Sequence, residues 1–405
     1  MTLTDEQEKI VNMAVEFSYS NQQIFEFSGL AGTGKSVTLM AIIERLGLQP
    51  HEYMPMAFTG AATLVMRMKG FPNARSIHSS LYKLIEVNTY VPPTGFEMVN
   101  TSMDIKKKQK KFCIKHPDEI PNEVKYFIID EGYMVPDYMV RQILSFGRKV
   151  IVAGDKHQLP PISSSAGFLV RDDIPTLNTI MRQAANNPIL VLAHMILRGD
   201  KIDCGVYGNV VVTDDIDPRY IVYSDAIICH TNKLRDEIND YVRISLGKDI
   251  TLKYPVLGDK LICRKNNWSV ETDDGIPLTN GLTGYCINVN NGTNYKNGTY
   301  DIDFLPLVSN CPLRNLPINY EFFNSDYMTK RMILRPMKDD RFVKYEGEMF
   351  EYAYAITCHL AQGQEFNNGV IFEEPTIYDM YRQWMYTAIT RFKQNLIIVR
   401  SPRRR

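Results

Sequence analysis

The sequence predicts an α/β protein made of two parallel-sheet units, with an insert of short antiparallel strands. Three observations support this. An apolar stretch at 24–27 runs into a glycine-rich loop and then an amphipathic stretch at 36–46, which is strand, loop and helix in order. Apolar stretches at 125–129 and 149–153 end in polar residues, as parallel strands do at a ligand-binding edge. Residues 251–350 are rich in Asn, Gly and Pro with short alternating runs, a pattern typical of a small β-barrel.

The glycine-rich loop fits the phosphate-binding pattern G-x-x-x-x-G-K-[ST]. Its glycines let backbone N–H groups turn inward, and the N-terminus of the following helix adds its positive dipole end. Lys35 is expected to reach the β- and γ-phosphates and Ser36 to ligate Mg²⁺, so ATP and Mg²⁺ are the predicted cofactors. The predicted phosphate-site residues are Gly29, Ala31, Gly32, Thr33, Gly34, Lys35 and Ser36.

Two later strand ends complete a nucleotide-hydrolysis pattern. The strand at 125–129 runs into Asp130, which suits Mg²⁺, and Glu131, which suits the polarisation of an attacking water. The strand at 149–153 leads to Gln158, whose amide has both a donor and an acceptor for sensing a γ-phosphate. Together with the phosphate loop, these residues predict catalysis of nucleotide hydrolysis.

Composition limits the remaining possibilities. The chain has 405 residues and 46 basic against 46 acidic side chains, so a globally basic nucleic-acid binder is not indicated, although a lysine run at 106–111 is a local patch. It has no apolar run of about 18 residues and a polar, acidic beginning, so no membrane partner is expected. Its seven cysteines lack metal-ligand spacing, which favours reduced thiols, a cytoplasmic location and no zinc.

The motifs, in order, resemble those of superfamily 1 helicases, and most closely the RecD/Dda-type branch, superfamily 1B, which includes the phage Dda-type. G-L-A-G-T-G-K-S, I-I-D-E and G-D-K-H-Q-L-P are similar to motifs I, II and III. Residues 182–183, 357–366 and 386–391 resemble motifs IV, V and VI. The start at 3–7 resembles the adenine-reading glutamine motif, and 57–62 with 76–79 resembles the first strand-contacting motif.

The resemblance implies an architecture with expected boundaries. A RecA-like unit is expected at 1–165, with a pin-like β-hairpin insert at about 84–120. A second RecA-like unit is expected at 166–250 and 351–405, split by an SH3-like β-barrel insert at 251–350. Phe96 is the candidate residue at the tip of the pin, and a plain exposed turn is the alternative for it.

The resemblance also implies roles for residues outside the phosphate loop. Arg182 and Arg391 are candidate arginine fingers supplied by the second unit. Gln7, Gly363 and Glu365 are candidate nucleotide contacts. The candidate nucleic-acid contacts are Thr59, His78, Ser79, Phe96, Thr357, His359 and Tyr386. For Tyr386, core packing is an equally good explanation. One departure is that motif II reads D-E-G-Y, where the family commonly has D-E-A-S.

The function that the resemblance implies is an ATP-dependent helicase that moves along single-stranded DNA, 5′ to 3′, and unwinds duplex DNA. The expected partners are single-stranded DNA and duplex junctions, with replication or recombination proteins, and the chain is expected to work as a monomer. Two alternatives stay open. One is a viral-type RNA helicase, although such enzymes often carry a Cys/His-rich zinc domain that this sequence lacks. The other is a nucleotide-gated ATPase that binds single-stranded DNA without unwinding duplex.

Overall fold

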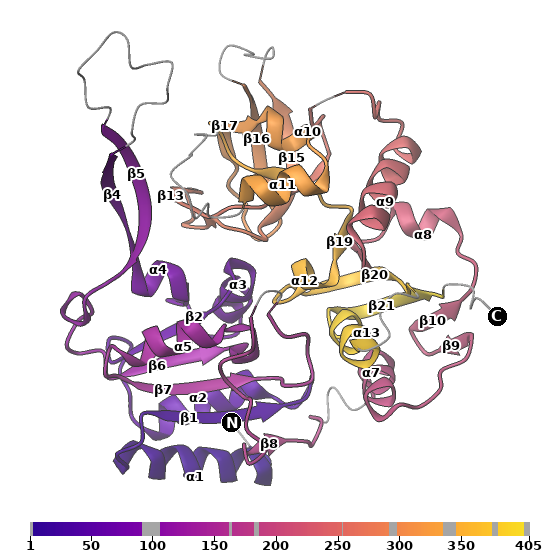
Figure 1. Ribbon diagram of the computed structural model, residues 1–405. Helices are drawn as coiled ribbons and strands as arrows, with labels where there is room; N and C mark the ends of the chain where they lie inside the picture. Colours follow the sequence, from indigo (N-terminus) through magenta and orange to yellow (C-terminus); the bar gives the residue numbers. More distant parts are fainter. Residues whose placement is uncertain are drawn as a thin grey trace.

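The computed structural model describes residues 3–90, 106–161, 164–181, 186–252, 254–290, 298–334, 346–374 and 380–400. Two six-stranded sheets are the centres of two α/β units, and a five-stranded antiparallel sheet forms a third body. Figure 1 shows the two units side by side, the third body above them, and a long hairpin rising from the first unit. No helix in the described part of the chain is long and apolar enough to cross a membrane.

The first unit is a doubly wound parallel sheet. Its strand order is β3 (Arg75–Ser76), β2 (Tyr53–Ala57), β6 (Tyr126–Asp130), β7 (Lys149–Gly154), β1 (Ile24–Gly29) and β8 (Thr176–Leu177), and every neighbouring pair is parallel. One face packs against α1 (Asp5–Tyr19) and α2 (Lys35–Arg45), the other against α4 (Ile77–Leu81) and α5 (Asp137–Leu144). Helix α3 (Gly60–Met68) and the short turns η1 (Pro117–Glu119) and η2 (Gly132–Met134) complete it. The predicted strand, loop and helix are confirmed.

The first unit extends beyond the boundary expected at residue 165. Strand β8 pairs in parallel with the end of β1, with Ser28 opposite Thr176. Nearby, the Glu6 carboxylate accepts hydrogen bonds from the backbone of Asn178 and Thr179. The expected boundary is therefore too early, because a two-residue strand carries too little periodic signal to be recognised before its partner is known.

The second unit is assembled from two separated pieces of chain. Its sheet order is β19 (Ala355–Thr357), β11 (Ala226–Cys229), β20 (Phe366–Phe372), β21 (Phe392–Val399), β10 (Val210–Thr213) and β9 (Gly205–Tyr207), parallel except for β9. Helices α7 (Pro188–Arg198), α12 (Cys358–Ala361) and α13 (Tyr381–Ile389) pack on one face. Helices α8 (Pro218–Val222) and α9 (Asn232–Ser245) pack on the other. This explains why motifs distant in sequence share one unit.

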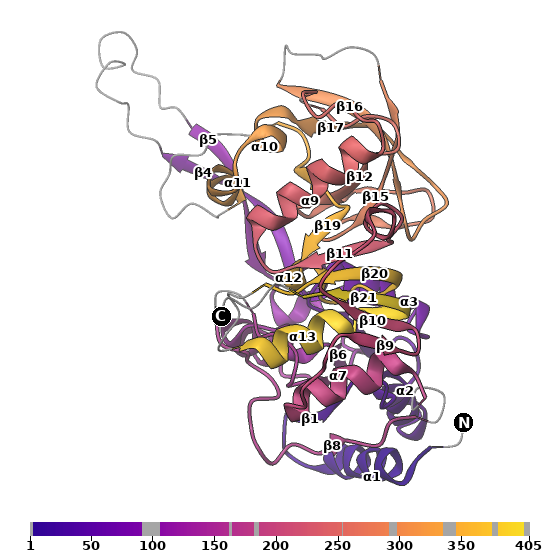
Figure 2. The same cartoon turned by 90° about the vertical axis from the view of Figure 1, so that its right-hand side faces the viewer.

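The hairpin of the first unit is formed by β4 (Tyr82–Tyr90) and β5 (Lys106–Ile114), which pair antiparallel from Tyr82 opposite Ile114. It overlaps the range of about 84–120 expected for the pin insert, begins two residues earlier, and projects away from the sheet (Figures 1 and 2). The lysine run forms most of β5. Phe96 lies outside the described residues, so its place at the tip stays a prediction.

The third body is a curved antiparallel sheet. Its order is β17 (Leu313–Asn319), β16 (Thr299–Pro306), β15 (Thr283–Val289), β12 (Lys260–Cys263) and β18 (Phe350–Tyr352). A separate pair, β13 (Asn267–Glu271) and β14 (Pro277–Leu278), and helices α10 (Tyr320–Asn324) and α11 (Tyr327–Leu334) accompany it. Within the described residues, the edge strands β17 and β18 do not pair with each other. Only an isolated bridge between Ile318 and Glu348 connects the two edges, so the sheet does not form a closed barrel. The antiparallel insert is confirmed, whereas the closed SH3-like barrel is not found.

A buried carboxylate joins this third body to the second unit. Glu351 on β18 lies 3.3 Å from Arg235 on α9 and 3.4 Å from Lys330 on α11, and Arg264 after β12 also contacts it. Only 5% of the Glu351 side chain is exposed. A buried carboxylate must be paired, so the contacts fix how the insert sits on α9.

Lys330 should make stability depend on pH. Burial, and after it the charge of Arg235, lower its pKa from 10.5 to about 8, even with Glu351 nearby. Between these values the unfolded chain holds a proton that the folded chain has lost, and stability rises with pH wherever the unfolded state binds more protons. Relative to Lys330→Met, the free energy of unfolding of the wild type should therefore increase from pH 8 to 10.5. Denaturant titrations across this range measure the difference, and a flat or falling difference contradicts the prediction.

Candidate nucleotide site between the two units

The phosphate loop connects the end of β1 to the start of α2. Gly34 precedes the helix with a left-handed φ of 83°. A side chain there would meet Gln7 Nε2 at 2.5 Å, so the position needs glycine for space as well as for backbone conformation. Lys35 Nζ donates to the carbonyl oxygens of Gly29, at 2.8 Å, and Leu30, at 3.3 Å. The loop therefore has the geometry of a helix N-terminal phosphate site.

Gln7 supports this loop from behind. Its side chain is fully buried, and its Nε2 donates to the carbonyl oxygen of Thr33 at 3.1 Å. Its Oε1 accepts from the backbone N–H of Thr4 at 3.0 Å, which caps α1. The structure therefore gives Gln7 a positioning role, and the contact with adenine implied by the resemblance stays a prediction. Gly29 and Thr33 likewise shape the loop through hydrogen bonds within it.

Asp130 is the last residue of β6, and Glu131 follows it. Glu131 has a positive φ of 53°, an uncommon conformation for a residue with a side chain, as the chain turns out of the strand. Burial, and after it the charge of Asp130, raise the pKa of Glu131, while Lys35 and Arg391 act in the opposite direction. The acids and the cations from both units therefore share one electrostatic environment.

The unusual glycine of D-E-G-Y is explained by packing. A Cβ at Gly132 would lie 2.2 Å from Val152 Cγ1 on the neighbouring strand β7. Because the stiff valine side chain cannot move away cheaply, this close approach excludes even alanine. The departure from the family pattern therefore belongs to sheet packing beside the site.

Both units line one cleft of about 490 Å³. The first unit supplies the loop residues Ala31, Gly32, Gly34, Lys35 and Ser36, together with Asp130, Glu131 and Gln158. The second unit supplies Glu365, before β20, and Arg391, before β21. The sequence also leaves unrecognised several residues that line the cleft, because they belong to no motif: Met40, Lys69, Met181, Asn187, Leu190, Phe392 and Lys393.

The cleft contains groups suited to a nucleotide with Mg²⁺. Gln158 is 3% exposed and its Oε1 has no hydrogen-bond partner in the described structure, so this oxygen can accept from a water or a ligand. Asp130 and Ser36 supply a carboxylate and a hydroxyl at the phosphate loop. Mg²⁺ is typically held by one or two carboxylates with substrate phosphates, so these residues fit it.

Arg391 is held in place by its own unit. It is 5% exposed, its Nε donates to the carbonyl oxygen of Thr387 at 3.1 Å, and an Nη donates to Thr390 Oγ1 at 3.3 Å. These bonds fix the guanidinium group at the wall of the cleft. The other candidate finger, Arg182, lies outside the described residues and stays a prediction.

Tyr386 joins the units directly. Its hydroxyl donates to the Asp155 carboxylate and accepts from the backbone N–H of Ala31, at 2.7 Å, in the phosphate loop. Beside it, the Leu159 N–H donates to Thr387 Oγ1 at 2.9 Å, and Gln362 Nε2 donates to the Leu159 carbonyl at 2.8 Å. Motifs V and VI of the second unit thus bind motifs I and III of the first.

This placement bears on three predicted contacts. Tyr386 is fully buried, which favours the packing alternative over a nucleic-acid contact. Thr357 is 8% exposed at the end of β19, which leaves its side chain little access to a strand. Gly363 packs against α3, where an added Cβ would lie 2.7 Å from Ala62, so it does not line the nucleotide cleft. All three depend on tertiary packing rather than local pattern.

The other candidate nucleic-acid contacts lie at accessible element ends. Thr59 caps α3 by accepting from the Ala62 N–H, and Ser79 borders a second groove beside the third body. His78 lies between the rings of Phe58 and Tyr82. Burial lowers the pKa of His78 and of His359, so both are neutral near pH 7 and suit hydrogen bonding or stacking rather than ion pairing with phosphate.

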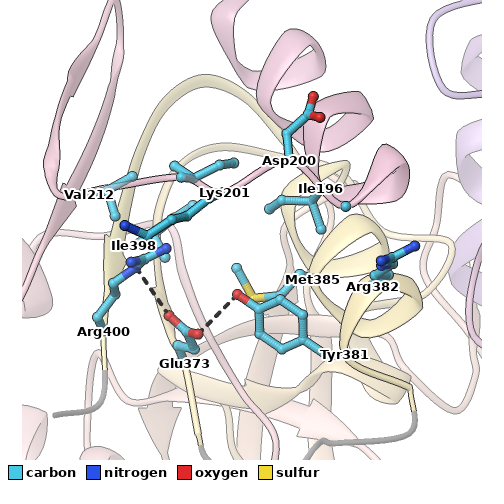
Figure 3. Close-up of a pocket in the computed structure, with 12 residues that line it drawn as sticks. Ile196, Asp200, Lys201, Val212, Glu373, Tyr381, Arg382, Met385, Ile398 and Arg400 are labelled. Atoms are coloured by element: carbon cyan, nitrogen blue, oxygen red, sulfur yellow. Dashed lines mark hydrogen bonds and ion pairs between the residues drawn. The ribbon is translucent and has the colours of Figure 1, made fainter. Parts of the chain in front are cut away.

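A further cavity of about 340 Å³ lies at the carboxyl ends of β20 and β21 in the second unit (Figure 3). Figure 3 shows Glu373 at its floor, joined to Arg400 and to Tyr381. The Tyr381 hydroxyl donates to Glu373 at 2.9 Å. Glu373 therefore has partners within this cavity, and no glycine-rich loop is among its lining residues. The phosphate loop lines the cleft between the units instead.

Tyr386→Phe tests the bridge between the units. The change removes one hydroxyl and leaves the buried Asp155 carboxylate and the Ala31 N–H each without that partner, which typically costs about 1–3 kcal/mol. We expect slower ATP turnover and weaker stimulation by DNA, with nucleotide binding largely kept, because Lys35 and the loop remain. Steady-state hydrolysis and nucleotide titration measure the two effects. Unchanged turnover would show that the bridge does not support catalysis.

Family models match both units of the chain, and a curated relative matches part of it. The family model of an AAA domain matches residues 2–208, and that of a UvrD-like helicase C-terminal domain matches residues 352–399. The ATP-dependent RecD2 DNA helicase of Deinococcus radiodurans is 28% identical over 207 residues, covering 49% of this chain and 24% of that protein. This chain thus spans about a quarter of the length of that relative.

Solved structures share the fold. Pif1 helicase from Candida albicans is 16% identical, with a TM-score of 0.51 over 98% of this chain and 94% of that one. Pif1 from Bacteroides, in complex with ADP-AlF3 and single-stranded DNA, is 18% identical, with a TM-score of 0.53 over 99% of this chain and 93% of that one. The chain therefore belongs to the AAA domain family, and its fold is similar to that of the Pif1 helicases.

Proposed function

We propose that the chain is an ATP-dependent DNA helicase that moves along single-stranded DNA and unwinds duplex. The observation that carries this proposal is the composite cleft, in which Arg391 and Tyr386 of the second unit meet the phosphate loop of the first. An ATPase that only needed to hydrolyse nucleotide would not require two units to share one site. A shared site makes hydrolysis change how the units are held together.

The residues of the first unit divide the chemistry. Lys35 and the loop N–H groups would hold the β- and γ-phosphates, and Ser36 and Asp130 would hold Mg²⁺, which when bound would neutralise charge on the phosphates. Glu131, with its raised pKa, suits the orientation and deprotonation of the attacking water. The free Oε1 of Gln158 suits a hydrogen bond from that water.

The second unit stabilises the transition state. Arg391, fixed by Thr387 and Thr390, is the proposed finger, with Arg182 as a second candidate. Arginine fingers contribute about 10³–10⁵ in rate. When the γ-phosphate leaves, Arg391 loses its ligand. The hydrogen bonds that Tyr386 and Gln362 donate, and the one that Thr387 accepts from Leu159, connect this change to motif III. Repeated closing and opening against a bound strand produces stepping.

The nucleic-acid track is proposed to run over Thr59, His78, Ser79 and His359, beneath the third body. The hairpin β4–β5 is proposed to act as a pin at the duplex junction, with Phe96 at its tip. The third body is proposed to play the role of the SH3-like insert of the branch, although its sheet is open. Contacts of this kind hold phosphates through hydroxyls and N–H groups and hold bases by stacking.

DNA is favoured over RNA by the relatives. The matched protein from Deinococcus radiodurans is described as a DNA helicase, and the Bacteroides Pif1 structure contains single-stranded DNA. The 5′-to-3′ direction follows from the resemblance alone. Replication or recombination proteins as partners, and function as a monomer, remain proposals on the same basis.

Strand displacement tests the function and its direction together. We expect the purified chain with ATP and Mg²⁺ to release a labelled strand from a DNA duplex with a 5′ single-stranded tail, and to leave a 3′-tailed duplex intact. Lys35→Ala should abolish release, because it removes the cation that holds the phosphates.

The alternatives give different results. Displacement only of RNA duplexes would support the RNA helicase. DNA binding and hydrolysis without release from either tail would support the nucleotide-gated binding ATPase. Release of the strand from the 3′-tailed duplex alone would support the helicase function and contradict the 5′-to-3′ direction.

A further inference from the structure

We propose that Lys69 is a positioning residue for ATP hydrolysis, which ties the first unit to Glu365 of the second unit across the nucleotide cleft. The inference rests on the proposed function, because it names how DNA binding reaches the cleft. Lys69 follows α3 directly, belongs to no recognised motif, and lines the cleft together with Glu365.

The ion pair is geometrically well defined. Lys69 Nζ lies 2.7 Å from Glu365 Oε1, and Lys393 Nζ lies 2.5 Å from Glu365 Oε2. Lys393 belongs to the same unit as Glu365, so the Lys393–Glu365 pair does not depend on how the two units are placed. The pair with Lys69 crosses from one unit to the other, so its distance depends on how the two units are placed.

The electrostatic setting supports the pair. Although burial acts in the other direction, the charge of Lys69 and the hydrogen bond from Lys393 lower the pKa of Glu365 to about 2. Glu365, and more weakly Asp130 and Glu131, raise the pKa of Lys69 against its burial. Lys69 is therefore charged while it faces both Glu365 and the catalytic acids.

Helix α3 connects this ion pair to the proposed DNA track. Thr59 caps the start of α3, and Lys69 lies at its end. Along the helix, Gly363 of the second unit packs on Ala62, where an added Cβ would lie 2.7 Å away. Gly60 contacts Thr279 of the third body in the same way, at 2.0 Å from an added Cβ. Helix α3 is short and is contacted at Gly60, at Ala62 and, just after its end, at Lys69, so it moves as a rigid unit. A DNA strand bound at Thr59 therefore biases the position of Lys69.

The consequence is a specific division of labour. Lys35 and Arg391 act on the phosphates, whereas Lys69 acts through Glu365 to favour the closed arrangement. Its loss should raise KM for ATP and lower the factor by which single-stranded DNA stimulates turnover. A variant that only folds less well would lower the amount of active protein and leave KM and the stimulation factor of the folded fraction unchanged.

The test is a double-mutant cycle on the full chain. ATP hydrolysis is measured with and without oligothymidylate for the wild type, Lys69→Met, Glu365→Gln and the double variant. We expect each single change to raise KM and reduce DNA stimulation about three- to tenfold, and the double variant to be no worse than the poorer single variant. Lys69→Arg should keep KM and DNA stimulation close to the wild-type values, because it keeps the positive charge.

Lys125→Met is the matched control. Lys125 also forms an ion pair with a glutamate, Glu52, but within the first unit and away from the cleft, so this variant should behave as the wild type. Because the Lys69 pair is partly exposed, added salt should narrow the gap between wild type and Lys69→Met.

Two results overturn the inference: Lys69→Met with wild-type KM and stimulation, or a double variant whose losses are the product of the single ones. A wild type whose hydrolysis ignores DNA would contradict the proposed function instead, and the ion pair would then be judged on KM for ATP alone.

Discussion

The hydrogen bond between the Tyr386 hydroxyl and the Ala31 N–H is the contact on which the rest of the site depends. It joins the phosphate loop of one unit to the motif VI helix of the other, and the same hydroxyl donates to Asp155 at the start of motif III. Since all three groups are buried or half-buried, breaking the contact would leave polar groups without partners. The two units are therefore held in one arrangement by directional bonds beside the cleft.

This constraint explains the charge distribution of the cleft. The lysines and arginine that line it come from both units, and so do the carboxylates. The cationic groups can converge on a triphosphate only when the units are closed, and the acids then lie beside Mg²⁺ and the attacking water. Hydrolysis changes the charge at this junction. The attraction between the two units then changes, and this couples hydrolysis to their relative movement.

Local patterns were sufficient to predict much of the chain. The phosphate loop after β1 and the strand that ends at Asp130 are as expected, because each depends on short-range periodicity or on a fixed motif spacing. Arg391 and Glu365 could be placed at the cleft only through the resemblance, since nothing in their spacing points to a phosphate site in another unit.

The remaining features depend on tertiary placement. The short strand β8 is recognisable only beside β1. The third body stays open because its edge strands are connected only by the isolated bridge between Ile318 and Glu348. Tyr386 and Gly363 have the residue types of contact positions, yet their surroundings bury one and press the other against α3. Lys69 has no motif at all, and its role appears only when α3 and the loop before β20 are seen together.

The central claim is that the second unit completes the catalytic site, and the turnover of Arg391→Ala tests it most directly. ATP hydrolysis is measured at saturating single-stranded DNA, and nucleotide affinity is measured separately by titration. The composite cleft predicts that turnover falls by about 10³–10⁵ while the nucleotide still binds, because Lys35 and the loop are intact. Full DNA-stimulated turnover by Arg391→Ala would contradict it, and would place the chemistry in the first unit alone.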